Sequence, residues 1–307
     1  MTQENRKPRA SNYARLYTAL GLGLICNPWL MYQVLAQTFG QLWAVFAALL
    51  KGQRSIVPCR IAVPFKGCWK VYRGGITRKD SHSWGVLGQR FAYDFVLTKD
   101  DSTHGGNGGC LKDYHAFGQP VFAPAGGVVL VAVDHYRDYP YPGEGWIDWR
   151  VRDIRGNHVM LQHDEGTFSL IAHLRQGSCC VRRNQRVEAG QQIGECGNSG
   201  HSTEPHIHIQ AQDRSNFYLA LGLPIQFEPA HIIHVEASSA SSVVRRFSVR
   251  EWARTGDLVE PSLPNPQEEK TWQTLAATLT WRDAMMSLWG TAVSVTLILF
   301  TVRGWKR

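Results

Sequence analysis

Residues 119–133 read Gln119-Pro-Val-Phe-Ala-Pro-Ala-Gly-Gly-Val-Val-Leu-Val-Ala-Val133, and residues 157–163 read Asn157-His-Val-Met-Leu-Gln-His163. Both stretches are short, rich in β-branched residues and bounded by Gly, Pro, Asn or Asp, a composition typical of β-strands. The same pattern runs from about Ala62 to Glu228, and no long amphipathic helix interrupts it. It predicts a mainly β domain with two inserted loops, at residues 99–117 and 134–153.

Composition narrows the class of protein. The chain has 307 residues, of which 44% are hydrophobic, so it is not disordered as a whole. Its mean hydropathy of -0.24 excludes a polytopic transporter, although an average conceals one or two membrane spans. The net charge of +8 favours an anionic partner: nucleic acid, anionic lipid or an acidic wall polymer. Nucleic acid is disfavoured because no Lys/Arg stripe interleaved with aromatic residues appears in the β region.

Both ends of the chain are apolar. Residues 284–302 contain no charge, and a helix of that length would be roughly 28 Å long, close to one bilayer core. This predicts a transmembrane helix at 284–302, followed by a basic tail at 303–307; a buried core helix is the alternative. No charged residue lies between Arg15 and Lys51, but Asn27-Pro28 interrupts this N-terminal run, as a helix cap followed by a first turn would.

The N-terminal run allows more than one arrangement. Gln33, Gln37 and Gln41 recur every four residues and so share one helical face. One part of the run therefore spans the membrane, and the other lies in the interface or packs on a membrane-protein partner. A cleaved signal peptide is a further alternative, but no small-residue cleavage pattern supports it.

Basic residues at both chain ends set the expected topology. The positive-inside rule places both ends in the cytoplasm, which turns the middle of the chain outward; a double-span hairpin at the N-terminus would reverse this. The predicted organisation is a basic N-terminus with apolar membrane segments (1–54), a β domain (55–236), a linker (237–283), the transmembrane helix and the tail. The predicted location is a membrane, with the domain on its outward side. In such an oxidising place some of the seven cysteines are expected to pair.

The pattern with the clearest chemistry is Pro205-His206-Ile207-His208-Ile209. Positions i and i+2 of a strand point to the same face, so His206 and His208 present two imidazoles side by side while the isoleucines face the other way. This arrangement suits one metal ligand and one neighbouring catalytic group.

Several sequence motifs precede this histidine pair along the chain. They are residues 119–129, 156–163, 169–174 (Ser169-Leu-Ile-Ala-His-Leu174), 184–194 and 194–204 (Gly194-Glu-Cys-Gly-Asn-Ser-Gly-His-Ser-Thr-Glu204). In this order they resemble the lysostaphin-type (LytM-like) zinc metallopeptidases, a family of wall-lytic endopeptidases. The likeness runs from about Phe65 to Phe227. It implies an antiparallel β-sheet peptidase domain and a peptidoglycan peptide as substrate.

The resemblance also implies roles for single residues. It makes His208 a metal ligand, His206 and His173 catalytic, and Asp94, in Arg90-Phe-Ala-Tyr-Asp94, a second metal ligand. Arg90 stands where the family carries its ligand histidine, and a guanidinium cannot bind a cation. A variant branch of the family carries its histidine earlier, which makes His82 in Ser81-His-Ser-Trp84 the third ligand.

The remaining histidines carry weaker signals. His104 and His115 lie in a predicted surface loop and are weaker ligand candidates than His82. His158 and His163 lie in a strand pattern, where structural hydrogen bonding is expected. His201 lies in a polar turn and is expected to be exposed.

Together these residues predict a membrane-anchored zinc metalloendopeptidase. One Zn²⁺ bound by His82, Asp94 and His208 would keep an open coordination position and lower the pKa of a bound water towards about 7. His173 and His206 would share the general-base and oxyanion roles. The alternative is a catalytically inactive relative that binds the wall or activates another hydrolase.

Overall fold

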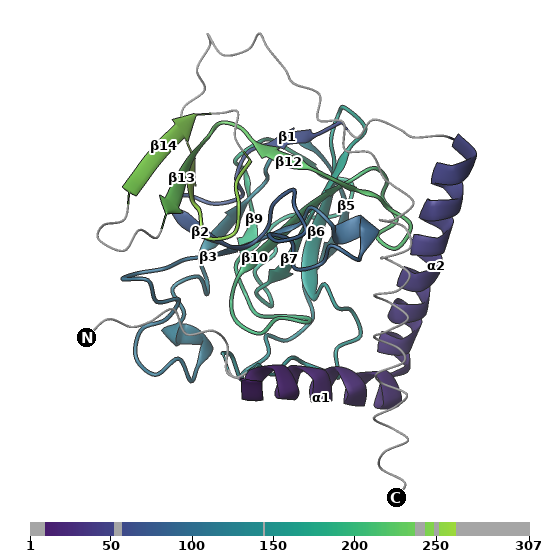
Figure 1. Cartoon of the computed structure of the whole chain (residues 1–307), viewed down its shortest axis with the longest axis horizontal. Coiled ribbons are helices and arrows are strands. Elements are labelled where there is room, and N and C mark those ends of the chain that lie inside the picture. The colour runs from purple at the N-terminus through teal and green to yellow at the C-terminus, as the bar shows by residue number, and fades with distance from the viewer. Residues whose placement is uncertain (1–9, 52–56, 144, 237–242, 249–251, 262–307) are drawn as a thin grey trace, which may run out of the picture.

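The computed structural model describes residues 10–51, 57–143, 145–236, 243–248 and 252–261 (Figure 1). Two helices come first, α1 (Ala10–Cys26) and α2 (Pro28–Lys51), and nearly all the regular structure that follows is β. Short 3₁₀ turns η1 (Leu87–Gln89) and η2 (Leu111–Asp113) interrupt the strands. The expectation of a mainly β domain is confirmed.

One large sheet organises the domain. Its order is β14-β13-β15-β2-β3-β10-β7-β6-β5-β8, with β11 attached to β10, and every described pairing in it is antiparallel. Its strands are β2 (Trp69–Arg73), β3 (Tyr93–Val96), β5 (Gly127–Val133), β6 (Asn157–Gln162), β7 (Phe168–Leu174), β8 (Arg186–Val187), β10 (Ile207–Gln212), β11 (Gly222–Leu223), β13 (Ala230–Glu236), β14 (Val243–Ser248) and β15 (Leu258–Pro261). Two small sheets accompany it: β1 (Cys59–Ile61) runs parallel to β12 (Ile225–Phe227), and β4 (Pro120–Phe122) runs antiparallel to β9 (Gln192–Glu195).

The core explains why the central strands are nearly continuously apolar. Phe65, Trp69, Tyr93, Phe95 and Phe227 are all buried and make stacked or edge-to-face ring contacts. Such pairs add to the free energy gained by burying their area. The aromatic cluster fixes β2 and β3 against the rest of the sheet.

Strand β10 lies between β3 and β7 and carries the predicted alternation. Ile207 and Ile209 are buried in the core, while His208 lies on the opposite face. In the antiparallel register His208 pairs with Asp94 of β3 on one side and with Ala172 of β7 on the other. This register brings together residues that are far apart in the sequence.

The sheet extends beyond the domain boundary predicted at residue 236. β15 is hydrogen-bonded between β2 and β13, and β13 also pairs with β14. Strands β14 and β15 fall within the predicted linker 237–283, so that part of the prediction is wrong. In β15, Val259 pairs with Trp69 and is fully buried. Residues 262–283, the predicted transmembrane helix 284–302 and the tail lie outside the described residues.

The two helices meet at a sharp bend on Asn27. The Asn27 Oδ1 accepts hydrogen bonds from the backbone N–H groups of Trp29 and Leu30, at 3.0 and 3.3 Å, so it caps α2 as the Asn-Pro pair predicts. Residues 14–26 and 28–44 are bent by 99° to each other, visible as the corner where α1 meets α2 (Figure 1). No single described helix is long and apolar enough to cross a membrane; the bent pair passes that test of length and composition when taken together.

The inserted loops and the cysteines complete the description. Residues 99–117 and 134–153 contribute no strand to the described sheets and are held by isolated bridges such as His104 with Tyr114 and Asp138 with Ser199. All seven cysteines are free, so the expected pairing is absent from the structure.

We expect β15 to contribute to the stability of the domain. Val259→Ala removes methyl groups from the core and should lower the free energy of unfolding by about 1–3 kcal/mol. Glu260→Ala, which changes the neighbouring, partly exposed position of the same strand, should stay within about 0.5 kcal/mol of wild type. Denaturant unfolding of the purified full chain measures both, and equal stabilities for the two variants would contradict the place of β15 in the core.

Candidate active site

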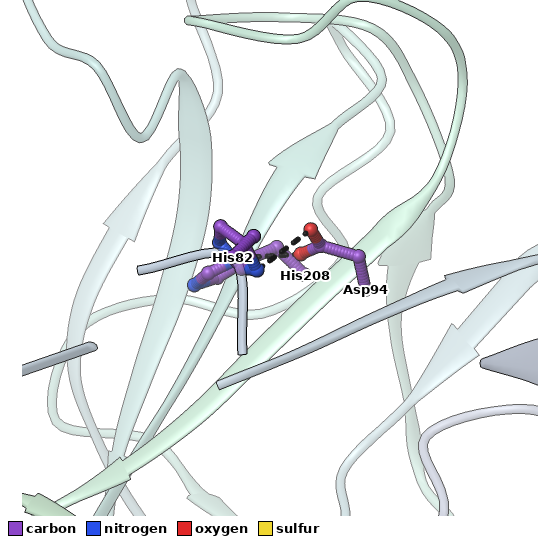
Figure 2. A group of neighbouring side chains, drawn as sticks. All are labelled: His82, Asp94 and His208. Atoms are coloured by element: carbon purple, nitrogen blue, oxygen red, sulfur yellow. Dashed lines mark hydrogen bonds and ion pairs between the residues drawn. The ribbon is translucent and has the colours of Figure 1, made fainter. Parts of the chain in front are cut away.

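Three predicted ligands lie together on one face of the sheet (Figure 2). Asp94 comes from β3, His208 from β10, and His82 from the segment between β2 and η1. Their potential ligand atoms all lie within 4.8 Å of one another. Asp94 is shared by the two imidazoles: its Oδ1 is 2.8 Å from His208 Nδ1 and its Oδ2 is 3.4 Å from His82 Nδ1.

The electrostatics of this cluster suit a divalent cation. Burial alone would raise the pKa of the Asp94 carboxyl, but the charges of the nearby imidazoles and the hydrogen bond from His208 outweigh it, so the pKa lies below its ordinary value. Burial lowers the pKa of His208, but the hydrogen bond and the negative charge of Asp94 raise it by more. The pKa of His208 therefore lies above its ordinary value. The cluster therefore keeps an ionised carboxylate among groups that lose protons when a metal binds.

The donor set fits zinc better than a hard cation. Two imidazoles and one carboxylate are the ligands of catalytic zinc sites, which keep a fourth position open for water or substrate. Asp94 and His208 are buried, whereas the side chain of His82 retains 30% exposure and forms the open side. These residues could hold one metal ion and leave it accessible.

His82 owes its place to a tied loop, although its segment contributes no strand. Arg90 is buried, stacks on the Trp84 ring at 4.8 Å and donates from Nε to the Trp84 carbonyl at 3.0 Å. Ser83 Oγ donates to the Gln89 carbonyl at 2.7 Å. Arg90 is therefore bound to the segment that carries His82 and occupies the ligand position of the family motif in sequence only.

The predicted catalytic pair stands beside the ligand cluster. The rings of His173 and His206 lie 4.8 Å apart, His173 lies 5.8 Å from the ring of His208, and His206 Nε2 is 3.7 Å from Asp94 Oδ1. His173 comes from β7 and His206 immediately precedes β10. All five predicted site residues are therefore brought together.

Hydrogen bonds define how the two imidazoles are protonated. The Nδ1 of His173 lies 2.8 Å from the Ser199 carbonyl, and the Nδ1 of His206 lies 2.8 Å from the Glu204 carbonyl. A carbonyl only accepts, so each Nδ1 carries a proton, and the tautomer that leaves the lone pair on Nε2 is the one each ring adopts when it is neutral. Burial, followed by the charges of His206 and His208, holds the pKa of His173 well below its ordinary value. His173 is thus neutral and able to accept a proton.

The backbone at His173 is strained. Its φ of +61° is in the left-handed region, which costs a residue other than glycine about 1–3 kcal/mol. The strain is held by two backbone bonds, from His173 N–H to the Arg155 carbonyl and from Gly197 N–H to the His173 carbonyl. Strain kept by surrounding bonds is a common property of catalytic positions, and no sequence pattern indicates it here.

Among the other histidines, two have structural hydrogen bonds, and one, His201, is less exposed than its sequence predicts. His163 bonds the Gly126 carbonyl and Ser169 Oγ, both at 2.9 Å, and His158 bonds the Gly156 carbonyl, as expected of structural histidines. His104 and His115 belong to no metal-type cluster in the described part of the chain. His201, expected to be exposed, is half-buried, and its Nε2 is buried without a hydrogen-bond partner.

A cavity of about 350 Å³ joins these groups. Asp94 and five histidines line it, together with the polar residues Gln89, Arg155 and Thr203; the histidines are His82, His173, His201, His206 and His208. The backbone N–H of His201 donates to the Ile154 carbonyl and holds His201 at the cavity. This contact joins distant segments, so the local sequence could not reveal it.

Comparison with known proteins identifies the domain. Residues 112–218 match the family model described as Peptidase family M23. The peptidoglycan DD-endopeptidase ShyA of Vibrio cholerae is 27% identical over 150 residues, which cover 49% of this chain and 27% of that protein. The DD-carboxypeptidase/endopeptidase Mpg of Neisseria meningitidis is 40% identical over 57 residues, which cover 19% of this chain and 13% of that protein. The chain thus spans about a quarter or less of the length of these relatives.

Solved structures give a weaker likeness. The catalytic domain of lysostaphin from Staphylococcus simulans is 20% identical, covers 51% of this chain and 88% of its own, and has a TM-score of 0.30. A zinc containing peptidase from Vibrio cholerae is 18% identical, with coverages of 55% and 39% and a TM-score of 0.32. The family match, rather than these TM-scores, confirms the resemblance to lysostaphin-type peptidases. That match includes His173, His206 and His208 and begins after His82 and Asp94.

We expect zinc content to depend on His82 as much as on His208. His82→Ala or His208→Ala leaves two protein ligands, too few for a catalytic zinc site, so each variant should lose stoichiometric zinc after dialysis. His104→Ala, which changes a histidine outside the cluster, should retain it. Elemental analysis of the purified proteins measures this. Full zinc retention in His82→Ala would exclude His82 as a ligand.

Proposed function

We propose that this chain, which carries a peptidase family M23 (lysostaphin-type) domain, is a zinc metalloendopeptidase that hydrolyses peptide bonds in peptidoglycan. The observation that carries the proposal is the cluster of His82, Asp94 and His208 with His173 and His206 at its edge. The peptidoglycan substrate is carried over from the name of the Vibrio cholerae relative, a peptidoglycan DD-endopeptidase. The net charge of +8 is compatible with an anionic wall polymer.

The residues of the chain divide the work of hydrolysis. A zinc ion held by His82, Asp94 and His208 would polarise the scissile carbonyl and lower the pKa of a water. His206 and His173 each engage a backbone carbonyl through Nδ1 and keep Nε2 for proton transfer. Either ring can take the proton of the attacking water, and a protonated ring can donate a hydrogen bond to the developing oxyanion or a proton to the leaving amine.

The competing proposal is a catalytically inactive module that binds the wall or activates another hydrolase. Arg90 in the family's ligand position is the observation that favours it. Against it stands the strained backbone of His173, because it costs free energy that a binding module has no need to expend.

We also propose that the chain acts at the bacterial cytoplasmic membrane, with the catalytic domain facing the periplasm or cell wall and without a nucleic-acid partner. The described helices support the membrane location. On α2 the buried face carries polar side chains and the exposed face apolar ones, the reverse of a helix on the surface of a water-soluble domain. On α2, Gln33 and Gln41 are buried against the domain, while the opposite face is apolar and exposed. The exposed apolar side chains of the two helices are Tyr17, Leu22, Ile25, Trp29, Met31, Tyr32, Leu35, Phe39, Leu42, Trp43 and Phe46.

Such a surface is costly in water and favourable in lipid or against a membrane-protein partner. On α2 the residues recur at spacings of three and four, as in Leu35, Phe39, Leu42 and Phe46, which forms one continuous stripe. The predicted membrane helix 284–302 would supply a second attachment.

We expect His206→Ala and His173→Ala to separate catalysis from metal binding. Neither residue belongs to the ligand cluster, so both variants should retain zinc, while hydrolysis of cross-linked peptidoglycan should fall by roughly 10²–10⁴-fold. Chromatography of the soluble muropeptides released from purified wall material measures the rate. His104→Ala should retain activity. Zinc-loaded wild type that releases no cleaved peptide would favour the inactive module instead.

A further inference from the structure

The N-terminal helix α1 forms part of the active-site cavity. Leu16 and Leu20 lie four residues apart, on one face of the helix, and both line the cavity that contains His82, Asp94, His173 and His206. Tyr17 and Ile25 lie elsewhere on the helix and are 68% and 62% exposed. The helix therefore presents one pair of side chains to the catalytic groups and other side chains to its surroundings.

The leucines meet an apolar section of the same cavity. Ile147, Ile154, Leu170 and Phe217 also line it, so α1 has apolar neighbours there as well as the histidine cluster. A cavity of about 350 Å³ is close to the lower end of small-molecule sites. Without Leu16 and Leu20 the groove would be wider on the side where α1 lies.

Hydrogen bonds fix the helix in this place. The Asn27 amide, at the end of α1, donates from Nδ2 to the carbonyls of Trp149 and Val151, at 3.1 and 2.7 Å. One turn into α2, Gln33 donates from Nε2 to the Arg152 carbonyl and accepts from the Ile154 N–H, both at 3.0 Å. Both side chains are buried, and the segment they bind, residues 147–154, contributes its two end residues Ile147 and Ile154 to the cavity wall.

Close packing supports the same attachment. A Cβ on Gly23 of α1 would lie 2.5 Å from Leu30 Cδ2 and 3.3 Å from the Trp149 carbonyl oxygen. A Cβ on Gly40 of α2 would lie 1.7 Å from the carbonyl oxygen of Tyr218, the neighbour of the cavity residue Phe217. These glycines allow the helices to approach the two segments that border the cavity. The helices lie outside residues 112–218, so this wall is not part of the matched M23 region.

We propose that α1 is a gate on the active-site groove: Leu16 and Leu20 narrow it, and an extended peptide chain reaches the catalytic histidines fully only when α1 moves away. The bonds of Asn27 and Gln33 hold the gate closed. The effect on hydrolysis rests on the proposed function, whereas the covering of the histidines by α1 does not.

The test compares two faces of the same helix. In the metal-free full chain, Leu16→Ala/Leu20→Ala should raise the rate at which diethyl pyrocarbonate modifies His206 several-fold, as mapped by mass spectrometry. The His206 side chain is 12% exposed with α1 in place, which leaves room for this increase. Tyr17→Ala/Ile25→Ala removes more side chain, but from outward positions, and should leave the rate unchanged.

A second variant loosens the gate from outside the cavity. Asn27→Asp keeps the oxygen that caps α2 but removes the amide donors to Trp149 and Val151, so it should also accelerate modification of His206. This keeps the test decisive if the double leucine variant does not fold. Equal modification rates in the inner-face, outer-face and Asn27→Asp variants would overturn the gate.

Activity supplies the functional half of the test. On soluble cross-linked muropeptide dimers, the zinc-loaded inner-face variant should show a several-fold higher kcat/KM than wild type, and the outer-face variant should match wild type. A raised KM with a lower kcat/KM would show that Leu16 and Leu20 bind substrate, which contradicts a gate. If no variant hydrolyses the dimer while modification of His206 still accelerates, the proposed function fails and the covering by α1 stands.

Discussion

The pairing of β3 with β10 is the constraint on which the site depends. It places Asp94 directly opposite His208, and the 2.8 Å hydrogen bond between them is buried in the face of the sheet. The isoleucines on either side of His208 anchor β10 in the core, so the register cannot shift by one residue without exchanging apolar and polar faces. The same core that stabilises the domain therefore fixes two of the proposed ligands and, through His206, one of the proposed catalytic groups.

Much of this could be predicted from the sequence because it depends on local periodicity. The alternation in residues 205–209 indicated which side chains face the core, and the ordered blocks indicated the family. The grouping of His82 with Asp94 and His208 required more, since His82 comes from a loop. The structure places it there through a loop tied by Arg90 and Ser83, contacts that no periodicity encodes.

Other features could not be predicted for a physical reason in each case. Residues 243–248 and 258–261 follow a Ser-rich stretch and lie near prolines, so they resemble a linker. Residues 243–248 become a strand because the preceding strand β13 offers a partner, and residues 258–261 because β2 offers one at long sequence separation. His201 has a polar local sequence, yet its environment is set by Ile154 and by the cavity residues of α1. In both cases tertiary contacts override what the local composition favours.

The N-terminal helices connect the site with the surroundings of the protein. Gln33 and Gln41 are buried against the domain, a stripe of large apolar side chains on α2 is exposed, and Leu16 and Leu20 of α1 line the cavity. Anomalous diffraction at the zinc absorption edge tests the proposed metal centre most directly. The proposed centre predicts one strong peak bonded to His82, Asp94 and His208 at about 2.0–2.2 Å. A zinc peak whose ligands exclude His82, or one located at His104 or His115, would contradict it.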